Sequence, residues 1–263
     1  MQNYLSISYD ILSSNEVRTC DDSTNFKYRL TPFFSSEVLS LPIHSYEILI
    51  DEGNRKVFKL NFSSHNTFFN FEPGLTLGVL PNNDENEVDQ LLMRLGVESV
   101  ADNYFKLGIL SNTKRKNACI PKHIPECCSL RKVFLQHVDI RSVPKKLFLK
   151  SLIPYVEDAG ERNELELLCS PKGSEQYNEL ISSYSKRSLL GLLNRFTTCN
   201  PPVEKLLEYL PPLLPRPYSI SSSPLIKEYF TITFNVDTFS NNEKSLCSSW
   251  LEKAFMSLRK QFL

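Results

Sequence analysis

The segment RPYSISSSP, residues 216–224, combines a fixed positive charge, an aromatic ring and a run of hydroxyl groups. The alternating apolar and polar residues of 230–236, FTITFNV, predict a strand with one buried face shortly after it. An arginine guanidinium donates forked hydrogen bonds to phosphate oxygens, and such charge-assisted bonds are stronger than neutral ones. A tyrosine ring offers a flat stacking face, which adds roughly 0.5 to 1.5 kcal/mol beyond burial. The segment therefore predicts a site for a planar ligand that carries phosphates.

The local geometry of this segment favours an extended chain. Pro215 and Pro217 restrict their own φ angles and the residue before each of them. In a strand, alternate side chains share a face, so Arg216 and Tyr218 would point to the same side. Ser219 would add a hydroxyl that can donate to or accept from a ring nitrogen. The alternative is an edge strand bounded by prolines that leads into a polar serine loop.

These residues resemble the Arg-x-Tyr-Ser/Thr flavin motif of the ferredoxin-NADP reductase superfamily, in its diflavin-reductase branch. The resemblance implies that Arg216 contacts the FAD diphosphate, that Tyr218 stacks on the isoalloxazine, and that Ser219 is the catalytic hydroxyl near flavin N5. It also implies cofactor contacts for Thr233 and Asn235 on the following strand. Within the branch, KHIPECCSL at 122–130 and IRSVPKKLFL at 140–149 resemble the methionine synthase reductases.

A second motif of that family, Gly-x-Cys-Ser/Thr followed by Trp-Leu, is similar to SLCSSWL at 245–251. It implies that the cofactor-binding residues include Ser245, Leu246, Cys247 and Ser248, at a helix start whose unpaired amides face the diphosphate. Ser245 stands where the family has glycine, which puts the strength of FAD binding in doubt if that position needs a positive φ or a close approach of the backbone. The alternative is an ordinary serine-capped amphipathic helix. A third similar segment, FEPGLTLGVLPNN at 71–83, is expected to be a scaffold turn and strand, with Leu75 where the family usually has aspartate.

Composition limits the classes of function. The 30 basic and 30 acidic residues cancel, so no global field would recruit nucleic acid or a membrane surface. No run of about 18 apolar residues could span a bilayer, and the first residues lack a signal pattern, so we expect a cytoplasmic protein. The seven cysteines include no C-x-x-C pair and are expected to be reduced thiols, with no metal site. The four histidines are expected to be structural or on the surface.

The expected fold class is α+β, an antiparallel flavin-binding β-barrel with an all-helical insertion. A hairpin is expected around residues 52–54, a helix near 86–94 and a strand at 104–110. Near-3.6 spacing of apolar residues predicts short helices between 144 and 210, with breaks at Pro154, 170–173 and 200–202. The expected domains are 1–40 as a linker or partly disordered segment, 41–143 as the first part of the barrel, 144–205 as the helical insertion, and 206–263 as the second part with the phosphate-binding helix.

The resemblance implies the FAD-binding module of an NADPH-dependent diflavin oxidoreductase. Electrons would pass from NADPH through FAD and FMN to the cobalamin of methionine synthase, so cobalamin-dependent methionine synthase and a flavodoxin-like FMN domain are the expected partners. FMN and NADPH are expected on domains outside this chain, which would lack turnover by itself. The alternatives are another diflavin reductase, such as one resembling cytochrome P450 reductase, and a flavin-free interaction module.

Overall fold

The computed structural model describes residues 3–9, 33, 38–53, 55–64, 71–238 and 243–259. The chain divides into two compact units: unit 1 comprises Met1–Tyr28 and Asn83–Leu213, and unit 2 comprises Arg29–Asn82 and Leu214–Leu263. Each unit has its own apolar core. The described strands form antiparallel sheets, and strands and helices follow one another in separate runs, so the expected α+β class is confirmed.

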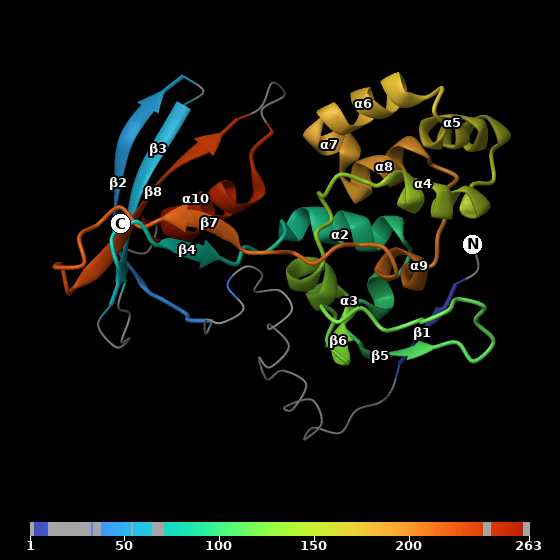
Figure 1. The fold of residues 1–263 in the computed structure, drawn as a ribbon, viewed down its shortest axis with the longest axis horizontal. Helices are drawn as coiled ribbons and strands as arrows, with labels where there is room; N and C mark the ends of the chain where they lie inside the picture. The colour runs from blue at the N-terminus through green and yellow to red at the C-terminus, as the bar shows by residue number, and fades with distance from the viewer. Residues whose placement is uncertain are drawn as a thin grey trace. The chain divides into compact units, whose positions relative to one another are not determined.

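The elements follow one another along the chain as Figure 1 shows. The strands are β1 (Leu5–Ser8), β2 (Ile43–Glu52), β3 (Arg55–Ser63), β4 (Thr76–Val79), β5 (Tyr104–Ile109), β6 (Cys127–Ser129), β7 (Arg216–Ser219) and β8 (Tyr229–Asp237). The α-helices are α2 (Glu85–Arg94), α3 (Leu130–Lys132), α4 (Lys146–Leu152), α5 (Ala159–Cys169), α6 (Ser174–Ser182), α7 (Tyr184–Arg187), α8 (Leu189–Arg195), α9 (Val203–Leu207) and α10 (Leu246–Arg259). Short 3₁₀ turns at Glu98–Val100 and Ile153–Tyr155 and a π-helical turn at Val133–His137 complete the described elements.

In unit 2, β2, β3 and β8 lie side by side as an antiparallel sheet (Figure 1). The β2–β3 hairpin turns at Gly53, whose φ of 55° is a left-handed value that glycine adopts without a steric penalty. A second positive-φ glycine, Gly74 at 90°, makes the turn before β4, and β4 pairs with β7. The predicted hairpin and the predicted Pro-Gly turn are therefore confirmed.

The core of unit 2 follows from the period of two along its strands. Phe230, Ile232, Phe234 and Val236 of β8 are all buried, while the residues at 233 and 235 between them are exposed. The β3 ladder places Phe58 opposite Phe234, and α10 covers this face with buried Leu251 and Phe255 among other apolar residues. The predicted strand with one buried face is confirmed.

Unit 1 combines a small sheet with a group of helices. β5 is its central strand, paired with β1 through Leu5↔Ile109 and with β6 through Phe105↔Cys128. The helix predicted near 86–94 is α2, whose N-cap Asp84 accepts hydrogen bonds from the amides of Asn86 and Glu87 at 3.1 and 3.3 Å. The predicted strand at 104–110 is β5.

The predicted short helices between 144 and 210 are α4 to α9, with the expected breaks: α5 ends at Cys169 and α6 begins at Ser174. Arg94 of α2 closes the end of α8 by donating to backbone oxygens of Leu193 at 3.1 Å, Thr197 at 2.9 Å and Cys199 at 3.0 Å. The last carbonyls of a helix have no partners within it, so this guanidinium supplies donors to the end of α8 and to the segment that follows it.

A buried ion pair joins α9 to the first strand of unit 1. Lys205 Nζ donates to Glu208 Oε2 at 2.5 Å, and both side chains are 1% exposed. Glu208 Oε1 also accepts from the backbone amides of Tyr4 at 2.6 Å and Leu5 at 3.2 Å. Because several donors satisfy the carboxylate, the pair can be buried without leaving an unpaired charge.

In the described part of the chain, no helix is long and apolar enough to cross a membrane, and no group of three or more His, Cys, Asp or Glu residues could hold a metal ion. Cys119, Cys128, Cys169, Cys199 and Cys247 are free thiols. Cys127 is disulfide-bonded, so the expectation that every cysteine is reduced is wrong at this position. Spacing along the sequence carries no information about which sulfur atoms the fold brings together. Cys20 lies outside the described residues.

Candidate functional site

The Arg-Pro-Tyr-Ser segment forms β7, as its prolines predict. β7 pairs antiparallel with β4, placing Arg216 opposite Val79 and Ser219 opposite Thr76. Arg216 and Tyr218 are partly buried, whereas Pro217 and Ser219 are exposed. This alternation puts the arginine and the tyrosine on one face, as expected for a strand.

The Tyr218 ring is held by the neighbouring strand β8. An isolated bridge between Ile220 and Ile232 sets the antiparallel register, and continuing it places Tyr218 opposite Phe234. The two rings meet edge to face, with centroids 5.8 Å apart and an interplanar angle of 72°. Tyr218 is thus oriented by an aromatic contact and still partly exposed, which leaves ring surface for a ligand.

The buried thiol of Cys247 lies beside Tyr218 and Arg216. Burial raises the pKa of Cys247 to about 11, while a hydrogen bond with Tyr218 and the positive charge of Arg216 act in the opposite direction. Arg216 is itself oriented by a 2.7 Å hydrogen bond from Nη1 to the carbonyl oxygen of Leu214. Three predicted site residues from two distant segments therefore meet in unit 2.

The start of α10 is reinforced by serine hydroxyls. Ser245 and Ser248 share a hydrogen bond between their Oγ atoms, and Ser249 Oγ donates to the Ser245 carbonyl at 2.6 Å. Leu246, Cys247 and Ser248 are all buried. Among the described non-glycine residues, only Asn117 has a positive φ, so Ser245 is not in the left-handed region. The φ angle at 245 therefore does not call for the glycine of the family motif, which leaves close approach of the backbone to the ligand as the remaining reason for glycine there.

The remaining predicted residues lie on the solvent side of unit 2. Ser219, Thr233 and Asn235 are exposed, and Thr233 Oγ1 lies 3.1 Å from Ser221 Oγ. The register of the bridge at Ile220 places Ser219 opposite Thr233, so these hydroxyls are neighbours on the outer face. The predicted residues thus form an inner group of Arg216, Tyr218 and Cys247 and an outer group of Ser219, Thr233 and Asn235.

The sequence alone does not identify Phe234 as the residue that supports the Tyr218 ring. The alternation of 230–236 places its side chain on the buried face, but nothing in the sequence says that β8 lies next to β7. The role of the Cys247 thiol as a hydrogen-bond partner of Tyr218 was likewise not foreseen, because it depends on a contact between segments about thirty residues apart.

Unit 2 also contains a cavity of about 500 Å³. Its lining includes Leu77 and Val79 of β4 and Trp250 and Leu251 of α10. A volume of this size is within the usual range for small-molecule sites. None of the predicted cofactor-binding residues lines it. The cavity adjoins the group of Arg216, Tyr218 and Cys247, because its lining residues Leu77 and Val79 are the strand partners of Tyr218 and Arg216.

The residues present fit a phosphate-bearing flavin. Arg216 supplies a guanidinium held by the Leu214 carbonyl, Tyr218 supplies a partly exposed ring fixed by Phe234, and α10 supplies a helix start whose first amides have no acceptor within the helix. In unit 2 the guanidinium and the helix start can bind the anionic part of the flavin, and the tyrosine ring can stack on its aromatic part.

Comparison with known proteins gives the following matches. The model of a family described as "FAD binding domain" matches residues 31–250. The chain is 35% identical over 224 residues to methionine synthase reductase of Homo sapiens, which covers 81% of this chain and 32% of the relative. It is 29% identical over 265 residues to methionine synthase reductase of Caenorhabditis elegans, covering 96% and 39%.

A second class of relative also matches. The chain is 28% identical over 225 residues to NADPH--cytochrome P450 reductase of Dictyostelium discoideum, covering 84% of this chain and 32% of the relative. The chain thus spans between 32% and 39% of the length of these curated relatives.

Proposed function

Because the chain belongs to the FAD binding domain family, we propose that unit 2 binds FAD through Arg216, Tyr218 and the first turn of α10. The observation that carries this proposal is the meeting of Arg216, Tyr218 and Cys247, which the fold brings together from β7 and α10. A cation, a ring and a helix start in one place are what a flavin dinucleotide requires.

In this proposal different residues bind different parts of FAD. Arg216 would pair with the diphosphate, and the amides of Leu246, Cys247 and Ser248 would add donors at the positive end of the helix. Ser245 would position that turn through its hydrogen bond to Ser248. Tyr218 would cover the ring system. Thr233 and Asn235, exposed in the outer group, would contact a part of the cofactor that extends beyond the face shared by Arg216 and Tyr218.

When bound, FAD would supply hydride acceptance and single-electron transfer, which no side chain of this chain provides. The protein contributes orientation. Ser219 is exposed at the end of β7 and would hold a hydrogen bond at the reactive edge of the ring, which is the catalytic role proposed for it. Phe234 contacts the Tyr218 ring edge to face and would help to orient the face that the ligand meets.

The whole protein is proposed to be an NADPH-dependent diflavin oxidoreductase of the methionine synthase reductase type. In this proposal electrons pass from NADPH through FAD and FMN to cobalamin-dependent methionine synthase in the cytoplasm, and a flavodoxin-like FMN domain is the immediate acceptor. The relatives named methionine synthase reductase support it. A reductase of the cytochrome P450 reductase type is the second candidate, supported by the Dictyostelium discoideum relative.

We also propose how the two units share this function. Strands β2, β3, β4, β7 and β8 of unit 2 would belong to the flavin-binding barrel, and the helices between 144 and 205 would be the insertion that orients it towards other domains. The bridge between Ile220 and Ile232 supports the first half, because it continues the β4–β7 pair into the β2–β3–β8 sheet. The helices α4 to α8 support the second half.

Titration of the purified chain with FAD tests the proposal. Flavin fluorescence should be quenched on binding, with a saturable curve and one FAD per chain. Replacing Arg216→Gln removes charge-assisted bonds to the diphosphate, so affinity should fall by about 10- to 100-fold.

The matched control is Arg55→Gln, which removes an exposed guanidinium from β3 of the same unit. It should leave affinity within about threefold, because the site does not use Arg55. Equal affinity of the wild type and Arg216→Gln would reject this site. Absence of saturable binding by a folded wild type would favour the flavin-free interaction module.

A further inference from the structure

Unit 1 contains a small apolar pocket that the flavin proposal does not use. Its volume is about 100 Å³, and it lies among α4, α8 and the segments that follow Asp139 and α9. Its apolar walls include Ile140, Leu147, Phe148, Leu189, Leu192 and Leu210. The volume is below the roughly 300 to 1,000 Å³ of sites for whole small molecules. The pocket has room for one branched aliphatic side chain.

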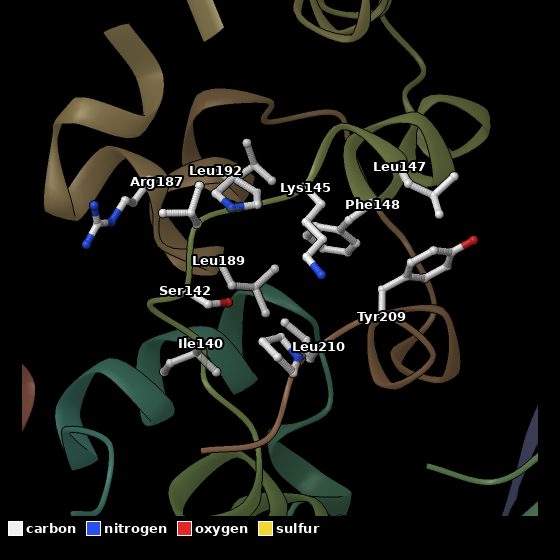
Figure 2. A pocket seen from close by; sticks show the side chains of 13 residues that line it. Ile140, Ser142, Lys145, Leu147, Phe148, Arg187, Leu189, Leu192, Tyr209 and Leu210 are labelled. Atoms are coloured by element: carbon white, nitrogen blue, oxygen red, sulfur yellow. The ribbon is translucent and has the colours of Figure 1, made fainter. Parts of the chain in front are cut away.

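One positive charge is directed into this pocket. Figure 2 shows the Lys145 ammonium pointing into the space between the apolar walls, whereas the Arg187 guanidinium and the Tyr209 hydroxyl point away from it. No Asp or Glu is among the 13 described residues that line the pocket, and no described carboxylate forms an ion pair with Lys145. An ammonium beside an apolar pocket favours an acidic group next to an apolar one.

A hydrogen-bond acceptor lies on the same wall. The Ser142 hydroxyl points into the pocket (Figure 2), and its proton is used in a 3.1 Å hydrogen bond to the carbonyl oxygen of Asp139. A serine hydroxyl has one proton and two lone pairs, so Ser142 retains capacity to accept but not to donate. The pocket therefore offers a cation, a hydrogen-bond acceptor and an apolar space with room for one side chain.

We propose that this pocket binds the C-terminal residue of a partner polypeptide that ends in leucine or a residue of similar size. The α-carboxylate pairs with Lys145, the amide N–H of the same residue donates to Ser142, and the side chain fills the apolar space. Capture of a terminal carboxylate is a recurring mode of peptide recognition. A C-terminal apolar residue supplies all three complementary groups within a few bonds.

The surface around the pocket favours a polypeptide over a free small acid. Val143 and Leu147 are 43% and 55% exposed, and both line the pocket. In the proposal these two residues form an apolar rim that a larger partner would cover. Residues that precede the terminal leucine would bury this apolar rim, which a free amino acid derivative cannot reach.

The probe is the peptide acetyl-Ala-Ala-Ala-Leu with a free carboxylate, titrated into the folded chain and followed by isothermal titration calorimetry. We expect saturable binding, and binding about tenfold or more weaker for the same peptide ending in a carboxamide, because a charge-assisted bond is lost. Lys145→Met should weaken binding of the free acid to a similar extent. It should leave binding of the carboxamide nearly unchanged.

The matched control is Lys150→Met, which removes an exposed ammonium from α4, the helix that Lys145 precedes, outside the pocket lining. It should bind the acid as the wild type does. Circular dichroism of each variant checks that the helices remain folded. Leu147→Ala, at an exposed position, should weaken binding about two- to fivefold through the apolar rim.

Three results would overturn the proposal. The first is absence of saturable binding of the acid peptide. The second is loss of the charge dependence, seen as equal binding of the acid and the carboxamide or as a loss in Lys150→Met equal to that in Lys145→Met. The third is binding of acetyl-leucine as tight as that of the tetrapeptide, which would indicate a site for a free N-acyl amino acid. None of these results depends on whether unit 2 binds FAD.

Discussion

The buried thiol of Cys247 should make the stability of unit 2 depend on pH in the alkaline range. Burial raises its pKa from 9.0 to about 11 in the folded protein, in spite of the hydrogen bond with Tyr218 and the charge of Arg216. The folded state therefore holds the proton more tightly than the unfolded state. The corresponding stability is fully present below pH 9 and is lost as pH rises towards 11.

The size of this effect follows from the shift. About two pKa units correspond to roughly 3 kcal/mol of unfolding free energy, of which about 2 kcal/mol should be lost by about pH 10.5. Cys247→Ala removes the titrating group. It also removes a buried side chain, but that cost does not change with pH. The stability difference between wild type and Cys247→Ala should therefore shrink by about 2 kcal/mol between about pH 8 and about pH 10.5.

Urea unfolding at these two pH values, followed by tryptophan fluorescence, measures the difference. Trp250 is the only tryptophan of the chain and lies in α10, so its signal reports on unit 2. Ser248→Ala is the control, because it changes the same turn without removing a titrating group. A stability difference between wild type and Cys247→Ala that stays constant with pH would refute the assigned burial of this thiol.

Three further predictions concern stability and the phosphate-binding turn. Glu208→Gln should destabilise unit 1 by about 3 to 5 kcal/mol, because it leaves the Lys205 ammonium buried without a counter-charge. Adding Lys205→Met should recover most of this loss. Urea unfolding followed by circular dichroism measures both variants. Arg94→Met should lower the free energy of unfolding by about 2 to 4 kcal/mol in the same assay. Arg94→Lys should not restore it, since one ammonium cannot donate to all of the carbonyls at the end of α8. Ser245→Gly should change FAD affinity by less than about tenfold in a fluorescence titration, because the φ angle at 245 does not need glycine; a much larger gain would show that the serine obstructs the phosphates.

Much of the local structure could be predicted from the sequence, because it depends on short-range patterns. The period of two at 230–236 predicted β8, and the Pro-Gly pair at Pro73 predicted the turn before β4. The near-3.6 spacing of leucines predicted the helices from α4 to α9. The prolines around Arg216 predicted that β7 is extended.

The contacts between distant segments could not be predicted in this way. The sequence does not say that β7 lies between β4 and β8, so the support of Tyr218 by Phe234 was not foreseen. The disulfide at Cys127 was missed for the same reason. The pocket around Lys145 depends on α4, α8 and the chain after α9, which come together only in the folded unit.

Retention of flavin by the purified chain is the most direct test of the proposed FAD site. The protein is incubated with excess FAD and desalted, and its visible flavin absorbance is compared with its protein content, for the wild type and for Tyr218→Leu. We expect about one FAD per wild-type chain and a large loss in Tyr218→Leu, because the stacking face is gone. A folded wild type that emerges colourless, or a Tyr218→Leu variant that retains as much flavin as the wild type, would contradict it.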